Sequence, residues 1–223
     1  MKSLLKIMIV LALLFASTFL IARFTGVLTV ENIEAWLTAA KSLSPVYVAI
    51  IVITLLFADL FIAVPTLTIS ILSGFFLGQF IGSAAAVTGM MLAGTIGYIL
   101  SYAYGERLVA LLIKDEQQRQ EARDTFQKHG IIMILLARAV PILPEVTACM
   151  AGATRMRFST FILAWSVSSV PYAMIAAYAG SISTLENPRP AIFTAIGLTA
   201  FFWVSWFIFQ RLNKKKSEIK AAE

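Results

Sequence analysis

The stretch IIMILLARAVPILPEVTACMAGAT, residues 131–154, decides how this chain is organised. It is apolar except around Arg138 and Glu145, and Pro141 and Pro144 lie between these two charges. A charged residue at the centre of a membrane helix costs about 2.5–3.5 kcal/mol on insertion scales. Proline removes a backbone donor and breaks a helix. A charged and broken apolar stretch therefore indicates a polar site within hydrophobic surroundings.

The composition indicates one integral membrane domain over residues 1–223. Of the 223 residues, 59% are hydrophobic and only 13% are charged, and the mean hydropathy is +0.85, far from soluble domains. The net charge of +6 would suit a nucleic-acid partner, but the basic residues stand at the ends of apolar runs, as membrane topology requires. We therefore expect an all-α membrane protein and no nucleic-acid partner.

The chain has one cysteine and one histidine, which limits its chemistry. Cys149 has no partner for an intrachain disulfide. His129 alone cannot assemble a zinc site or a histidine-containing catalytic triad. Asp59 and Glu145 would imitate an acid pair only if the fold brought them together. We expect no catalytic residue, no metal site and no cofactor, and the chain is not predicted to be an enzyme.

Residues 46–82 form a second broken apolar stretch, with Asp59 and Pro65 in its middle. The 14 residues at 46–59 reach only about 21 Å at 1.5 Å per residue, short of a hydrocarbon core of about 30 Å. We therefore predict that 46–82 and 131–154 are two opposed re-entrant helical hairpins. Three prolines are expected to shape their tips: Pro65, Pro141 and Pro144. Opposed broken helices form the binding site of many transporters.

The remaining apolar runs are long enough to cross a bilayer as helices. Four full spans are predicted, at 4–22, 83–104, 158–185 and 191–210. No clean cleavage pattern follows the first run, so an uncleaved span is expected there and not a signal peptide. The chain thus divides into an N-terminal span and outer connector at 1–45, a core at 46–185, and a last span with a basic tail at 186–223. Three glycines are expected at packing contacts between helices: Gly74, Gly78 and Gly152.

The most polar segment, residues 106–128, is predicted to be an amphipathic helix on the membrane surface. Five basic side chains would meet anionic headgroups there: Arg107, Lys114, Arg119, Arg123 and Lys128. A solvated helix in a loop is the alternative. With both hairpins returning to the side they entered, 14 Lys and Arg residues lie inside, 3 outside, and Arg138 in the membrane. This distribution obeys the positive-inside rule and places both termini in the cytoplasm.

Five sequence blocks resemble the DedA family, also described as the VTT or SNARE-associated Golgi protein domain. They are DLFIAVP (59–65), SGFFLG (73–78), GYILSYAYG (97–105), ARAVPILPE (137–145) and AGATRMRF (151–158). Classical members resemble one another in a second arginine three residues after the hairpin proline. Pro144 stands there in this chain, followed by Glu145, so the chain is similar to the branch with a proline pair. The resemblance covers residues 45–185 and implies movement of lipids or lipid-linked phosphates between leaflets.

Arg138 is the strongest candidate for substrate binding. A guanidinium stays charged and offers a planar fork that matches phosphate or carboxylate. Asp59 and Glu145 are acids in an apolar setting, which favours the neutral form and permits proton exchange. The alternative is a scaffold, in which Arg138 satisfies carbonyls freed by the prolines or pairs with one of the acids. The sequence leaves open whether the three residues share a cavity.

These observations favour a membrane transport protein that moves a lipid or lipid-linked phosphate between leaflets, as a scramblase or flippase does, with proton coupling as an option. One alternative is a proton-coupled transporter of a small ion or solute. Another is a non-transporting membrane organiser whose helix at 106–128 binds a partner or anionic lipid. The expected partners are anionic or phosphate-bearing membrane lipids, protons and a second copy of the chain. The expected location is the bacterial inner membrane.

Overall fold

The computed structural model describes residues 44–62, 64–112, 115–139, 142–184 and 187–222, and scattered positions before residue 44. Within these ranges every regular element is a helix and none is a strand, so the predicted all-α class is confirmed. The elements are α3 Pro45–Ala58, α4 Thr66–Leu112, α5 Glu116–Leu136, the short 3-10 helix η1 Ala137–Ala139, α6 Leu143–Ala153, α7 Phe158–Ser181 and α8 Arg189–Ala222. Most of the predicted first span at 4–22 and connector at 23–45 lies outside the described residues.

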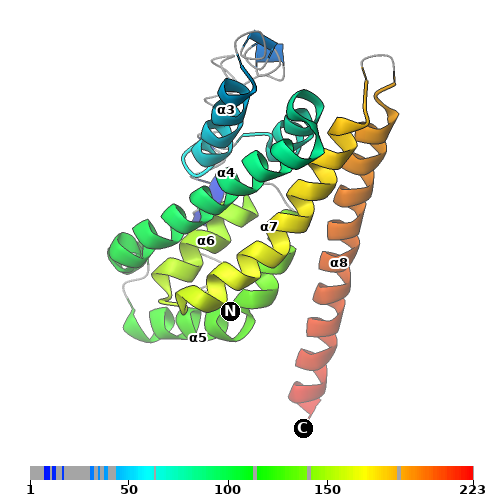
Figure 1. Ribbon diagram of the computed structural model, residues 1–223. Coiled ribbons are helices and arrows are strands. Elements are labelled where there is room, and N and C mark those ends of the chain that lie inside the picture. Colours follow the sequence, from blue (N-terminus) through cyan, green and yellow to red (C-terminus); the bar gives the residue numbers. More distant parts are fainter. Residues whose placement is uncertain are drawn as a thin grey trace.

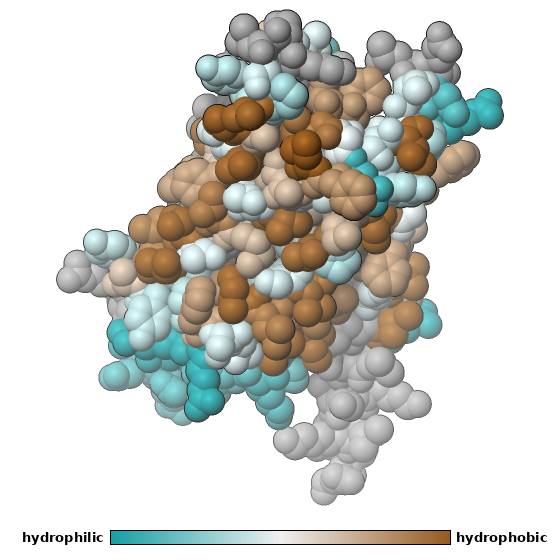
Figure 2. All heavy atoms as spheres, in the orientation of Figure 1, coloured by the Kyte–Doolittle hydropathy of each residue, from teal (hydrophilic) through white to brown (hydrophobic). Residues whose placement is uncertain are grey.

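Two helices are long and apolar enough to cross a membrane, Thr66–Gly105 within α4 and Phe158–Ser181. They contain most of the spans predicted at 83–104 and 158–185. Helix α3 and the Arg189–Ser205 part of α8 are also apolar but shorter. Figure 2 shows a broad hydrophobic band across the visible face of the molecule, and Phe80 and Leu163 are 85% and 67% exposed. Such a band is rare on soluble proteins and suits contact with lipid.

The chain is interrupted at the tips of both predicted hairpins. Residues 59–65 separate α3 from α4, and η1 with the residues after it separates α5 from α6. Figure 1 shows α3 at one end of the molecule, and α5 with the lower part of α6 at the other. The two interruptions therefore approach each other from opposite ends.

Helix α4 has a sharp bend at Gly78, where φ is +77° and ψ is 172°. A left-handed φ is open to glycine and strained for other residues. Past the bend the two limbs of α4 pack together, and the Ser73 hydroxyl donates to the Gly82 carbonyl oxygen at 3.1 Å. Gly78 was expected at a packing contact, and that expectation is wrong. No heavy atom lies within 4 Å of the position that a Cβ would take there, and the residue makes the bend.

The other two glycines do lie at close helix contacts. A side chain on Gly74 would collide with the backbone of Ala177 on α7. One on Gly152 would collide with the backbone of Tyr98 on α4. Small residues of this kind allow helix backbones to approach closely. They hold the limbs that carry the hairpin tips against α4 and α7.

The polar segment differs from the predicted helix at 106–128. Helix α4 continues to Leu112, and α5 begins at Glu116 because Asp115 caps it, its carboxylate accepting from the Gln117 amide at 2.9 Å. A side-chain acceptor at this position satisfies an otherwise unpaired amide of the first turn. The same α5 then runs without interruption into the second hairpin. Figure 2 shows hydrophilic residues gathered over α5, at the end of the molecule below the hydrophobic band.

Candidate functional site

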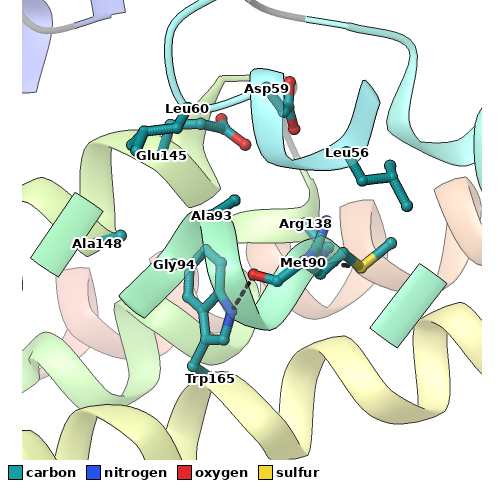
Figure 3. Close-up of a pocket in the computed structure, with 10 residues that line it drawn as sticks. All are labelled: Leu56, Asp59, Leu60, Met90, Ala93, Gly94, Arg138, Glu145, Ala148 and Trp165. Carbon is teal, nitrogen blue, oxygen red and sulfur yellow. Dashed lines mark hydrogen bonds between the residues drawn. The ribbon is translucent and has the colours of Figure 1, made fainter. Parts of the chain in front are cut away.

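The two hairpin tips meet at a small buried cavity of about 10 Å³, about the space of one water molecule. Its lining comes from both tips, from α4 and from α7: Leu56, Asp59, Leu60, Met90, Ala93, Gly94, Arg138, Glu145, Ala148 and Trp165. Figure 3 shows the two carboxyl groups on one side of the cavity, and Arg138, Met90 and Trp165 on the other. The structure therefore brings together the three charged residues whose proximity the sequence left open.

Asp59 stabilises the first tip through hydrogen bonds to other residues of the same tip. One carboxylate oxygen accepts from the Val64 amide and the other from the Thr66 hydroxyl, both at 2.9 Å. Thr66 is the first residue of α4, and Pro65 directly precedes it. A negative group at a helix N-terminus satisfies unpaired amides and is favoured by the helix dipole. Asp59, only 6% exposed, thus has a structural role that sequence reasoning missed, because its partners lie five and seven residues further along an irregular segment.

Glu145 lies in the first turn of α6, after Pro144. The residue before this helix, Ile142, has a left-handed backbone with φ of +75° and contributes no side-chain cap, so an acid in the first turn is favoured by the helix dipole. Glu145 is 8% exposed, and it lines the same cavity as Asp59. Two neighbouring carboxylates in an apolar cavity repel each other, which disfavours ionisation of both. The cavity therefore places two buried acids where the charge of each acts on the other.

Arg138 lies in η1, at the second tip, and is half-buried. Its Nη2 donates to the Ser169 hydroxyl at 2.9 Å and to the Met90 sulfur at 3.3 Å. The guanidinium carbon is 4.8 Å from the centre of the Tyr172 ring and 5.7 Å from that of Trp165. Cation–π contacts of this kind stabilise a partly desolvated charge.

No ion pair joins Arg138 to Asp59 or Glu145, all three of which the structure describes, although its charge acts on both acids through space. The alternative in which Arg138 pairs directly with one of the acids is therefore not observed. Both hydrogen bonds that Arg138 makes to the described residues come from Nη2. A guanidinium has five N–H donors, and those on Nε and Nη1 make no hydrogen bond to the described residues.

Helix α7 supplies a wall that sequence reasoning missed. Trp165, Ser169 and Tyr172 are spaced four and three residues apart and so share one helical face. The Trp165 indole donates to the Met90 carbonyl oxygen at 3.1 Å, which ties α7 to α4. A Cβ at Gly94 would collide with this indole, so the glycine makes room for it. The spacing of these three residues could have predicted a shared face on α7, but it did not indicate that this face contacts Arg138.

Of the predicted tip residues, Pro65 and Pro144 do not line the cavity. Pro65 precedes α4, and Pro144 occupies the second position of α6, where proline is tolerated because the amide has no helical partner. Pro141 lies outside the described residues. The arrangement thus places one guanidinium and two buried acids around a single cavity, which in this conformation has no room for a ligand larger than about one water molecule.

Comparison with known proteins supports one assignment. The model of the VTT domain matches residues 64–182, which is 119 of the 223 residues. The match includes Arg138 and Glu145 and ends at the end of α7. Searches of curated proteins and of solved structures give no significant match. Because the domain match covers more than half of an all-helical, strongly apolar chain, this protein belongs to the membrane-associated VTT domain family, the DedA family.

Proposed function

We propose that this protein moves a lipid or lipid-linked phosphate between the leaflets of a membrane, and that the cavity between the hairpin tips is the midpoint of the path. The observation that carries the proposal is Arg138, which is half-buried, unpaired with either neighbouring acid, and has donors to spare. A charge in this position is costly in a membrane protein. Binding a phosphate would compensate that cost.

The proposed placement in the bilayer follows from the apolar band and the broken helices. The hydrophobic band would face lipid, and the hydrophilic end over α5 would face the cytoplasm (Figure 2). The two tips would then enter from opposite faces and meet near the midplane, where many transporters place their site. This arrangement comprises four spans, two re-entrant hairpins and cytoplasmic termini, and it assigns transport without covalent catalysis.

The acid pair would adjust the charge that an incoming phosphate meets. With a proton shared between Asp59 and Glu145, the two acids carry one negative charge, and Arg138 balances it. A second proton would leave the guanidinium uncompensated and attract the phosphate, and its loss would favour release. Since the cavity holds about one water, the tips must separate during passage. Proton occupancy is therefore proposed to control binding, and hairpin movement to control access.

Reconstituted vesicles test the proposal. Fluorescent phospholipid in the inner leaflet becomes accessible to an added quencher only after exchange between leaflets. Arg138→Ala should lower the protein-dependent exchange rate by at least about tenfold, because charge-assisted hydrogen bonds contribute about 1.5–3 kcal/mol. Arg189→Ala is the matched control, since Arg189 is exposed at the start of α8 and its loss should leave exchange unchanged. Equal rates for Arg138→Ala and the wild type would reject the role.

A second candidate is supported by the size of the cavity. The cavity has space for about one water molecule beside Asp59 and Glu145. Such a site suits the coupled transport of a proton and a small ion or solute. That function predicts solute uptake that collapses with the proton gradient, and lipid exchange no faster than in empty vesicles. The same preparation distinguishes the two, because each predicts activity in only one of the two measurements.

A further inference from the structure

A second hollow lies away from the hairpin tips and shares no residue with the cavity there. It is open, has a volume of about 490 Å³, and lies between α4 and the turn that joins α6 to α7. Its lining is Tyr98, Ile99, Tyr102, Ala103, Arg155, Met156, Arg157 and Phe158. The side-chain amide of Gln127, on α5, donates to the Thr154 carbonyl oxygen at the start of this turn. The hollow therefore lies beside the hydrophilic α5 end of the molecule.

The turn holds Arg155 in a left-handed backbone conformation that is usually adopted by glycine. The Met156 amide donates to the Ala151 carbonyl oxygen and the Arg155 amide to that of Gly152, which is the Schellman ending of a helix. The residue in the left-handed position of this ending is most often glycine, and here it is Arg155 with φ of +56°. Arginine pays a conformational cost there of about 1–2 kcal/mol. A side chain retained against such a cost indicates a use for it.

Aromatic rings place the arginine at the rim of the hollow. The Arg155 guanidinium carbon lies 5.1 Å from the centre of the Tyr102 ring. The Tyr98 hydroxyl donates to the Met156 carbonyl oxygen and so anchors the turn to α4. Arg157 is exposed beside them, directly before α7. Two fixed cations thus share one opening, and the first turn of α7, which has no side-chain cap, faces the same turn.

Away from the two arginines, the walls of the hollow are apolar. Ile99 on α4 and Phe158 on α7 are 50% and 45% exposed, and both belong to helices long and apolar enough to cross a membrane. A ligand that fits must therefore be anionic at one end and apolar at the other. Arginine forks match phosphate oxygens, and tyrosine is typical of the membrane interface. A phospholipid with net negative charge has this chemistry, whereas a choline headgroup would bring a cation toward two arginines.

We propose that this hollow binds the headgroup of an anionic phospholipid, with Arg155 and Arg157 at the phosphate and Ile99 and Phe158 along the upper acyl chains. The lipid is a bound companion of the protein, and the site is independent of the transport function proposed above. It anchors the α6–α7 turn at the cytoplasmic interface, where anionic lipids attract basic groups.

Native mass spectrometry of the full-length protein in detergent tests this site. The probes are dioleoylphosphatidylglycerol, dioleoylphosphatidylcholine and soluble glycerol phosphate. The wild type should retain one phosphatidylglycerol more tightly than any phosphatidylcholine, and Arg155→Gln with Arg157→Gln should weaken that binding by about tenfold or more. Lys128→Gln, which removes an exposed cation of α5 at the same end, should leave it unchanged.

Two further variants guard against a folding artefact. Arg155→Gly suits the left-handed backbone, so it should be at least as resistant to unfolding as the wild type and yet lose phosphatidylglycerol. Arg155→Lys with Arg157→Lys keeps the charge but not the fork and should bind with intermediate strength. Undiminished binding by Arg155→Gly and the glutamine variant, equal retention of phosphatidylcholine, or displacement of the lipid by glycerol phosphate at equal concentration would each overturn the proposal.

Discussion

The two hairpin tips satisfy their polar groups in opposite ways. At the first tip, Asp59 accepts hydrogen bonds from Val64 and Thr66, which are five and seven residues away in the chain, so its partners are local. At the second tip, Arg138 donates to Met90 and Ser169, which are 48 and 31 residues away in the chain. A locally closed turn can form with its own hairpin. A tip held by α4 and α7 forms only when the whole bundle packs, and it can also respond to movement of that bundle.

This contrast assigns different tasks to the tips. The first tip is a rigid cap that holds one half of the acid pair in place. The second carries Arg138, the left-handed Ile142 and the uncapped start of α6, all of which depend on neighbouring helices. In the proposed transport cycle, the second tip is therefore the part that moves when the cavity opens.

Asp59→Ala should produce the largest loss of stability. It removes two buried hydrogen bonds from a charged acceptor, and we expect a fall in the free energy of unfolding of about 3 kcal/mol. Circular dichroism during denaturation by sodium dodecyl sulfate in mixed micelles measures it. Thr66→Val removes only one of the two bonds and should lose about half as much. If both variants unfold like the wild type, the first tip is not closed by its own carboxylate.

Ser169→Ala should have a smaller effect than Asp59→Ala, and the effect should be on lipid exchange and not on stability. Loss of the hydroxyl removes the hydrogen bond between the Arg138 guanidinium and α7, and lipid exchange in vesicles should fall by up to about tenfold, the equivalent of one hydrogen bond to a charged group. The neighbouring Ser168→Ala is the control, since its hydroxyl donates to the Leu135 carbonyl oxygen at 3.4 Å and does not touch Arg138. Equal losses from the two variants would mean that general packing of α7, and not the position of Arg138, limits exchange.

Glu145→Gln should have the smallest effect at a single pH. A glutamine amide can donate to the Asp59 carboxylate but cannot act as an acid, so lipid exchange should persist and its dependence on pH should flatten. Leaflet exchange measured over a series of pH values, with and without a proton gradient, reports this. Glu121→Gln, an exposed acid on α5, should keep the wild-type profile. A full pH dependence in Glu145→Gln would place the titrating group elsewhere.

Local patterns in the sequence predicted much of the fold. Apolar runs predicted the long helices, and the charges and prolines near residues 59–65 and 138–145 predicted the two interruptions, because they are incompatible with a continuous helix. The start of α5 was misplaced, and the bend at Gly78 was not predicted. Both depend on single residues, a cap at Asp115 and a left-handed glycine, which average hydropathy over a window does not register.

By itself, the sequence determined the helical class, the apolar helices and the residues that interrupt them, since these follow from burial of apolar groups and from backbone bonding within a few residues. Only the tertiary structure decided that Asp59 and Glu145 line one cavity while Arg138 donates to Ser169 and Met90 and lies against aromatic rings of α7. These contacts join segments separated by tens of residues. Close approaches such as Gly74 against Ala177 and Gly152 against Tyr98 set them, and their geometry exists only once the helices have packed.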